Sequence, residues 1–236
     1  MENNIDFLCL GQTVPEESKK YGLRVCTAGW DVNNECLVRI YPLGVNKDHH
    51  FKRWHIYKNL PVRNNPKDSR KESWRLNIDI TELSTIDCKK YDGNRIAALK
   101  MMFDLYGSKD IVTLNQSRKS LAIINMVKPH GYFENKSKII QNVNQLSMFE
   151  DLNTNNMLGK NGFDYLPRIE FKDELNKPHK LMFNSWDAYM HQINLAPKYG
   201  KDNLWNQLKL SPKDNKLALI GNMNHQRNAW LIISTF

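Results

Sequence analysis

The sequence predicts an α+β chain, mostly β, that is divided into two small domains with a few short helices. Short apolar and β-branched runs end at turn residues on both sides of a polar, asparagine-rich stretch. At 236 residues and 41% hydrophobic content, the chain can bury two cores. We therefore expect an N-terminal domain at 1–136, a polar linker at 137–162, and a C-terminal β-rich domain with one or two helices at 163–236.

The N-terminal region is expected to be mainly strands. The Asn33-Asn34 pair lies between two apolar runs and favours a hairpin turn, because Asn tolerates a positive φ. One helix is predicted over residues 94–106, with a cap at Asp92 or Asn94 and an end at Gly107. The strands are predicted at residues 5–10, 23–30, 36–41, 54–57, 74–80 and 121–128.

Beyond the polar stretch the apolar pattern resumes. Ser185 is a suitable N-cap for a helix that ends near Leu195, before Pro197. A second short helix is predicted at 202–208. Strands are expected at residues 169–171, 180–183, 217–220 and 230–234.

The charge of the chain favours a polyanionic partner. It carries 34 basic and 25 acidic residues, for a net charge of +9. The four cysteines have no spacing typical of a metal site, so we expect no metal, no cofactor and reduced thiols in a cytoplasmic protein. No run of residues is long and apolar enough for a membrane span, and we expect no membrane partner.

Much of the excess charge lies in residues 51–75, which hold eight basic and two acidic residues. Basic side chains neutralise phosphates, and interleaved aromatic rings can stack on bases. The alternative is a solvated basic loop whose aromatic residues belong to the core. The predicted nucleic-acid contacts are Arg39, Lys52, Arg53, Trp54, Tyr57, Lys58, Arg63, Lys67, Arg70, Lys71 and Arg75.

The same segment contains the candidates for catalysis. Asp68 and Glu72 are spaced by four residues and could hold a metal for phosphodiester cleavage. His55 and His179 are candidate general bases, a role that histidine side chains often take in enzymes. Such a run of alternating charges is more often internally paired and solvated, so the sequence favours binding over catalysis.

A short apolar motif interrupts the polar stretch at residues 145–149. Gln145, Leu146, Ser147, Met148 and Phe149 resemble the peptide by which bacterial DNA-handling proteins dock on the replication sliding clamp. Gln145, Leu146, Met148 and Phe149 are therefore the predicted partner-binding residues. The alternative is an amphipathic turn that packs on one of the domains.

The polar loop at residues 222–228 joins the last two expected strands. Its Asn222, Asn224, His225, Gln226 and Arg227 could contact bases or phosphates. The simpler interpretation is a surface hairpin loop.

Several short strings resemble an uncharacterised bacterial family related to prokaryotic dual OB-domain proteins. They are Val-Cys-Thr-Ala-Gly at 25–29, Arg-Ile-Tyr-Pro at 39–42, Lys-Arg-Trp at 52–54 and Asp-Ser-Arg-Lys-Glu-Ser at 68–73. The resemblance implies two small OB-like barrels and work on nucleic acid, in DNA handling or genome defence. It supplies no reaction.

We expect a nucleic-acid-binding accessory protein that contacts single-stranded DNA or RNA through residues 51–75. Two alternatives remain open. One is an adaptor that docks on the sliding clamp, or in a larger defence complex, through residues 145–149. The other is a metal-dependent nuclease or nucleotide-processing enzyme that uses Asp68, Glu72 and His55.

Overall fold

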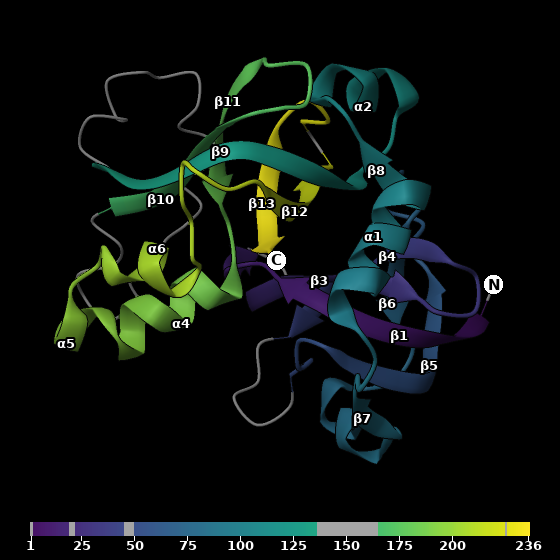
Figure 1. Ribbon diagram of the computed structural model, residues 1–236. Helices are drawn as coiled ribbons and strands as arrows, with labels where there is room; N and C mark the ends of the chain where they lie inside the picture. Colours follow the sequence, from purple (N-terminus) through teal and green to yellow (C-terminus); the bar gives the residue numbers. More distant parts are fainter. Residues whose placement is uncertain (1, 19–21, 45–49, 136–164, 225) are drawn as a thin grey trace.

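The computed structural model describes residues 2–18, 22–44, 50–135, 165–224 and 226–236, and it contains two β-sheets (Figure 1). The first sheet closes in the order β1-β3-β4-β6-β5 and returns to β1. Its β4 and β6 are parallel. The elements are β1 (Glu2–Gln12), β2 (Glu16–Ser18), β3 (Gly22–Asp31), β4 (Cys36–Gly44), β5 (His55–Asn64), β6 (Ser73–Leu76) and β7 (Cys88–Lys90), with a 3₁₀ helix η1 (Ile80–Thr85) before β7.

The second sheet closes in the order β9-β10-β11-β13-β12 and returns to β9. Its β11 and β13 are parallel. The strands are β8 (Gly107–Ser108), β9 (Leu121–Asn135), β10 (Tyr165–Lys172), β11 (Pro178–Phe183), β12 (Lys216–Asn222) and β13 (Trp230–Thr235). The helices are α1 (Arg95–Tyr106), α2 (Ile111–Ser117), α4 (Trp186–Asn194), α5 (Ala196–Tyr199) and α6 (Asn203–Gln207).

Both barrels have the same connectivity. In each, the five main strands close in the order first, second, third, fifth, fourth, with the third parallel to the fifth. This is the five-stranded Greek-key arrangement of the OB fold. The predicted fold class is confirmed: the chain is mostly β, with two small OB-like barrels and a few short helices.

The boundary between the barrels differs from the expected one. β9 was expected within the N-terminal domain, but it pairs with β10 and β12 and is the first strand of the second barrel. The two sheets therefore divide ahead of β8, and residues 136–164 connect two strands of one barrel. The expected linker falls within those residues, whose structure is not described.

Each barrel has its own apolar core because alternate side chains of its strands point inward. Phe7, Ile40 and Leu60 are fully buried in the first barrel, and Phe171 and Phe183 are buried in the second. α4 and α6 add Ala188, Leu204 and Trp205 to the second core.

A third apolar cluster joins the barrels through their outer faces. It contains Leu8 and Leu37 from the first barrel, Leu99 from α1, and Leu121 and Ile233 from the second barrel. The second barrel therefore covers part of the outer face of the first barrel, and the candidate site lies where the two meet.

The parts of the chain that the structure describes hold no helix that could cross a membrane.

Candidate nucleic-acid interface

The outer face of the first barrel carries a row of arginines. Val25, Ile40 and Val62 belong to the barrel core, so the neighbouring positions on the same strands point outward. Arg63 and Arg75 are cross-strand partners on β5 and β6. The outward residues are Arg24 on β3, Arg39 and Tyr41 on β4, Arg75 on β6 and Arg63 on β5.

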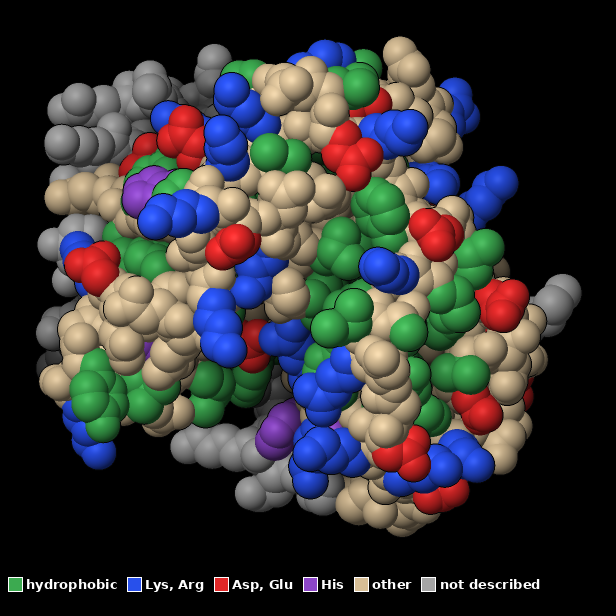
Figure 2. Space-filling model, viewed as in Figure 1, with side chains coloured by type: hydrophobic (Ala, Val, Ile, Leu, Met, Phe, Trp, Pro, Cys, Tyr) green, Lys and Arg blue, Asp and Glu red, His purple; other side chains and the backbone are tan. Residues whose placement is uncertain are grey.

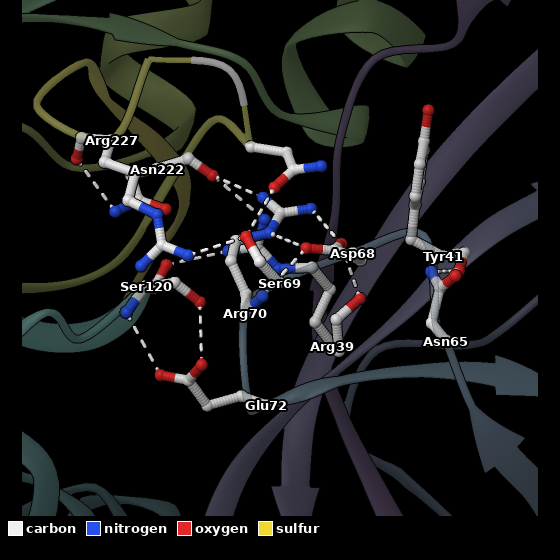
Figure 3. A network of polar contacts seen from close by, with 12 residues as sticks. Arg39, Tyr41, Asn65, Asp68, Ser69, Arg70, Glu72, Ser120, Asn222 and Arg227 are labelled. Atoms are coloured by element: carbon white, nitrogen blue, oxygen red, sulfur yellow. Dashed lines mark hydrogen bonds and ion pairs between the residues drawn. The ribbon is translucent and has the colours of Figure 1, made fainter.

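A pocket of about 180 Å³ lies where this face meets the second barrel. The first barrel lines it with Arg24, Arg39 and Arg70, together with Thr13 and Tyr41. The second barrel supplies the facing wall, which includes Asn184, Asn222, Asn224 and Leu231. Figure 3 shows Arg39 and Arg70 reaching toward Asn222 and Ser120, whereas Tyr41 points away from this network.

Arg39 is the most buried cation at this pocket, with 4% of its surface exposed. Its guanidinium donates to the carbonyl of Asn222 at 2.9 Å and to the carbonyl of Ser120 at 2.7 Å. Among the described residues, no carboxylate lies within ion-pair distance of it. Burial lowers the pKa of Arg39 and repulsion from Arg70 adds to this effect, but a guanidinium remains charged in proteins. The site therefore holds a buried positive charge that no carboxylate of the described ranges neutralises directly.

Arg70 and Asp68 form a buried ion pair. Arg70 donates to the Asp68 carboxylate through its backbone N–H and through Nε and Nη2 of its guanidinium, and its Nη1 donates to the Asn222 carbonyl at 2.7 Å. Ser73 Oγ donates to the same carboxylate. Both side chains are about 5% exposed or less. Asp68 therefore holds the β5–β6 loop in place, with Arg70 turned toward the second barrel.

The second carboxylate that was a candidate for catalysis is also structural. Glu72 accepts from the backbone N–H and the hydroxyl of Ser120, both at 3.0 Å, and so ties the first barrel to the start of β9. No group of three or more metal-ligating side chains occurs in the described ranges. The hydrogen bonds of Asp68 and Glu72 therefore favour structural roles for both carboxylates over the alternative of a metal-dependent site.

The two candidate histidines, His55 and His179, bond to partners other than Asp68 and Glu72. His55 Nδ1 is 3.1 Å from the carbonyl of Arg53. His179 Nε2 is 2.8 Å from Asp173, a buried carboxylate that also accepts from two backbone N–H groups of its own turn. In the described structure neither ring bonds to Asp68 or Glu72. The candidate catalytic residues Asp68, Glu72, His55 and His179 are therefore not brought together by the hydrogen bonds of the described structure.

Replacing Asp68 by Asn tests the structural role of this carboxylate. Burial opposes its ionisation, but bonds from Arg70 and Ser73 outweigh that effect and lower the pKa of Asp68. A depressed folded-state pKa gives stability that is present above the unfolded value of about 4 and is lost as the pH falls through the folded value. We expect Asp68→Asn to lower the free energy of unfolding by about 2 kcal/mol at pH 7, because charge-assisted bonds are lost.

Urea unfolding at pH 7 and pH 3 measures this effect. The difference between the wild type and Asp68→Asn should shrink at pH 3. An equal difference at both pH values would show that ionised Asp68 does not carry the effect.

Residues 51–75 hold four large aromatic rings, and the prediction that such rings stack on bases is wrong for three of them. Phe51 and Tyr57 are buried in the core of the first barrel, and Trp54 is buried in the cluster between the barrels. The fourth, Trp74, is partly buried against the first core. These rings therefore stabilise the fold, and no fully exposed π-face remains among them for a base.

The basic residues of the segment do not form one surface. Lys52 is exposed, and Arg53 forms an ion pair with Asp187 at 2.7 Å, beside the N-terminus of α4. β5 then carries the chain about 26 Å from His55 to Arg63. Lys58, half-buried, lies between these ends. Lys67 and Lys71 are exposed on the β5–β6 loop, close in sequence to Arg70 and Arg75.

The space-filling view shows basic side chains on both barrels. Lys and Arg side chains gather along the hollow between the barrels on the face that Figure 2 shows, and others are scattered over both barrels. Of the predicted contacts, those on the outer face or its rim are Arg39, Arg63, Arg70 and Arg75, with Lys67 and Lys71 on the adjoining loop. We retain these six as the predicted contacts.

Sequence reasoning missed two residues of this face. Arg24 and Tyr41 line the pocket, and both alternate with core residues of their strands. Period-two alternation around Val25 and Ile40 was the available signal. In the polar loop at 222–228, Asn222 and Asn224 line the pocket and Arg227 donates to Ser69 Oγ at 2.7 Å.

Comparison with known protein families gives one match, which covers the first barrel. Residues 3–100 match the family described as "Domain of unknown function (DUF8758)". The match spans the first barrel and the start of α1, which is less than half of the chain. No curated protein matches the chain. The predicted clamp-binding residues Gln145, Leu146, Met148 and Phe149 lie outside the described residues.

Proposed function

We propose that this protein binds single-stranded nucleic acid across the outer face of its first barrel. The observation that carries the proposal is the row of outward arginines on a barrel of OB topology. OB folds bind oligonucleotides on the face of their second and third strands, together with the loops after the first and the fourth strands. Here these elements are β3 and β4, residues 13–18 after β1, and the β5–β6 loop.

The charges of this face suit a phosphate backbone. Arg63 and Arg75 lie on the adjoining strands β5 and β6, and Arg24 lies on β3, with β4 between β3 and β6. Lys67 and Lys71 are exposed on the β5–β6 loop. The nearby acids Asp68 and Glu72 are already engaged by Arg70 and Ser120. Basic side chains that neutralise phosphates release the counterions condensed on the strand, so the affinity rises with the number of contacts.

Tyr41 gives this face one aromatic side chain. It is half-buried, lies between Arg24 and Arg75 in the order of the strands, and points away from the polar network (Figure 3). A base that stacks on an aromatic ring gains about 1–3 kcal/mol. Stacking requires an unpaired base, so we propose a single strand and not a duplex as the ligand.

The resemblance to dual OB-domain proteins favours a role as an accessory protein in DNA handling or genome defence. The adaptor hypothesis keeps its sequence motif but gains no structural support, because that motif lies outside the described residues. The structural bonds of Asp68 and Glu72 leave a nuclease without assigned catalytic groups.

Fluorescence anisotropy with a labelled single strand and with a duplex of the same sequence tests the proposal. We expect the single strand to bind more tightly, with a slope of about −3 for log K against log salt if four phosphates are contacted. An affinity that does not change between low and high salt, or no binding at low salt, would contradict the proposal.

A further inference from the structure

The pocket between the barrels differs from the open face beside it. Its arginines come from the first barrel, whereas its far wall is formed by the second, through Asn184, Asn222 and Asn224. From this arrangement we infer that the pocket binds the terminal phosphate of the strand. The inference rests on the proposed function and adds which part of the ligand is held here.

The charge of the pocket favours a dianion. Arg70 is neutralised by Asp68, but Arg39 is bonded only to backbone carbonyls among the described residues. A buried charge interacts more strongly than an exposed one because the local dielectric constant is low. A terminal phosphate monoester carries close to two negative charges at neutral pH, whereas an internal phosphodiester carries one. Arg39 therefore favours the end of a strand over an internal link.

The pocket is small for a ligand site. Its volume is about 180 Å³, whereas pockets for ligands of drug size start near 300 Å³. A phosphate group with part of its sugar is the portion of a strand that best suits this volume.

The wall from the second barrel favours the end of a strand over its middle. An internal phosphate carries a sugar on both sides, and both must leave the pocket. Asn222 and Asn224 cover the arginines from the side opposite the first barrel, so a strand that enters from the open face meets them. A terminal phosphate is bonded to one sugar only, so the strand has to leave the pocket on one side.

Two side chains that line the pocket, Asn224 and Thr13, have hydrogen-bond donors for the phosphate oxygens. Among the described residues, Asn224 is bonded only through its Oδ1, at 3.4 Å from Ser69, so its amide N–H groups can donate. Thr13 Oγ1 accepts from the backbone of Cys26, which leaves its hydroxyl proton to donate. Together with Arg39 these groups surround an anion from both barrels.

Competition with three unlabelled versions of one strand tests the inference. They carry hydroxyl groups at both ends, a 5′-phosphate, or a 3′-phosphate. We expect one of the two phosphorylated strands to bind at least tenfold more tightly than the hydroxyl strand, and the arm that does so identifies the end. Equal affinity of all three would overturn the inference while leaving the proposed function intact. No binding of any strand at low salt would overturn both.

A pair of matched variants locates the effect. Arg39 is built into the interface between the barrels, so its substitution can disturb folding; Arg24, half-buried at the pocket, is the better choice. Arg24→Gln should abolish the preference for the phosphorylated strand. Arg63→Gln, on the same face but outside the lining of the pocket, should weaken all three strands by a similar factor. A preference that survives Arg24→Gln would assign the phosphate to another site.

Discussion

Replacing Arg39 by Ala is expected to lower the free energy of unfolding by about 4 kcal/mol. Arg39 links the barrels, because its two bonds end on carbonyls of Ser120 and Asn222. Bonds to a charged group contribute about 1.5–3 kcal/mol each. Both carbonyls keep a second donor, from the Asn222 N–H and from Arg70, which limits the loss. Truncation of a long buried side chain adds a cavity to that cost.

Urea unfolding of Arg39→Ala and Arg39→Met separates these contributions. Met fills most of the space and also removes a buried charge, so we expect a loss of about 2 kcal/mol for this variant. Arg63→Ala, on the exposed end of β5, is the control and should change stability by less than about 0.5 kcal/mol. Arg39→Ala with a loss as small as that of the control would show that the guanidinium does not hold the barrels together.

Reversing two charges on the outer face is expected to weaken binding of a single strand about 100-fold near 0.1 M salt. Arg63 and Arg75 are cross-strand partners, so Arg63→Glu with Arg75→Glu places two carboxylates where the proposed strand has its phosphates. Each reversal replaces attraction with repulsion, and a factor of about ten for each corresponds to 1.4 kcal/mol. Anisotropy with a labelled single strand measures the loss.

The control for this variant carries the same change in net charge at another place. Lys198 and Lys213 are exposed on α5 and on the loop before β12 in the second barrel. Lys198→Glu with Lys213→Glu should weaken binding less than about fivefold, through the general field of the protein alone. Equal losses in both double variants would mean that net charge, and not the proposed face, determines binding.

Local sequence signals predicted most of the elements but not their pairing. Asn94 caps α1 and Ser185 caps α4, as their hydrogen-bonding capacity indicated. The strand expected at 74–80 ends at Leu76 and is followed by a 3₁₀ helix, because Asp79 and Glu82 form a capping box. α2 was missed because its β-branched residues favour strands, whereas Asp110 caps it as a helix.

The barrel closures and the site depend on contacts that are distant in sequence. From the sequence alone, β9 was assigned to the N-terminal domain. Its pairing with β12, which lies more than 80 residues further along the chain, places it in the second barrel. Arg39 was an expected contact, but its bond to Asn222 spans 183 residues and no local pattern indicates it. Trp54 resembled a stacking platform by its basic neighbours, yet the second barrel covers the surface on which it lies.

The salt dependence of single-strand binding in the wild type and in Arg63→Gln with Arg75→Gln tests the central claim most directly. Each phosphate contact contributes about 0.7 to the slope of log K against log salt for a single strand. If the strand lies on the outer face of the first barrel, the slope of the double variant should be shallower than that of the wild type by about 1.4. Equal slopes in the two proteins would place the phosphates elsewhere and contradict the proposed face.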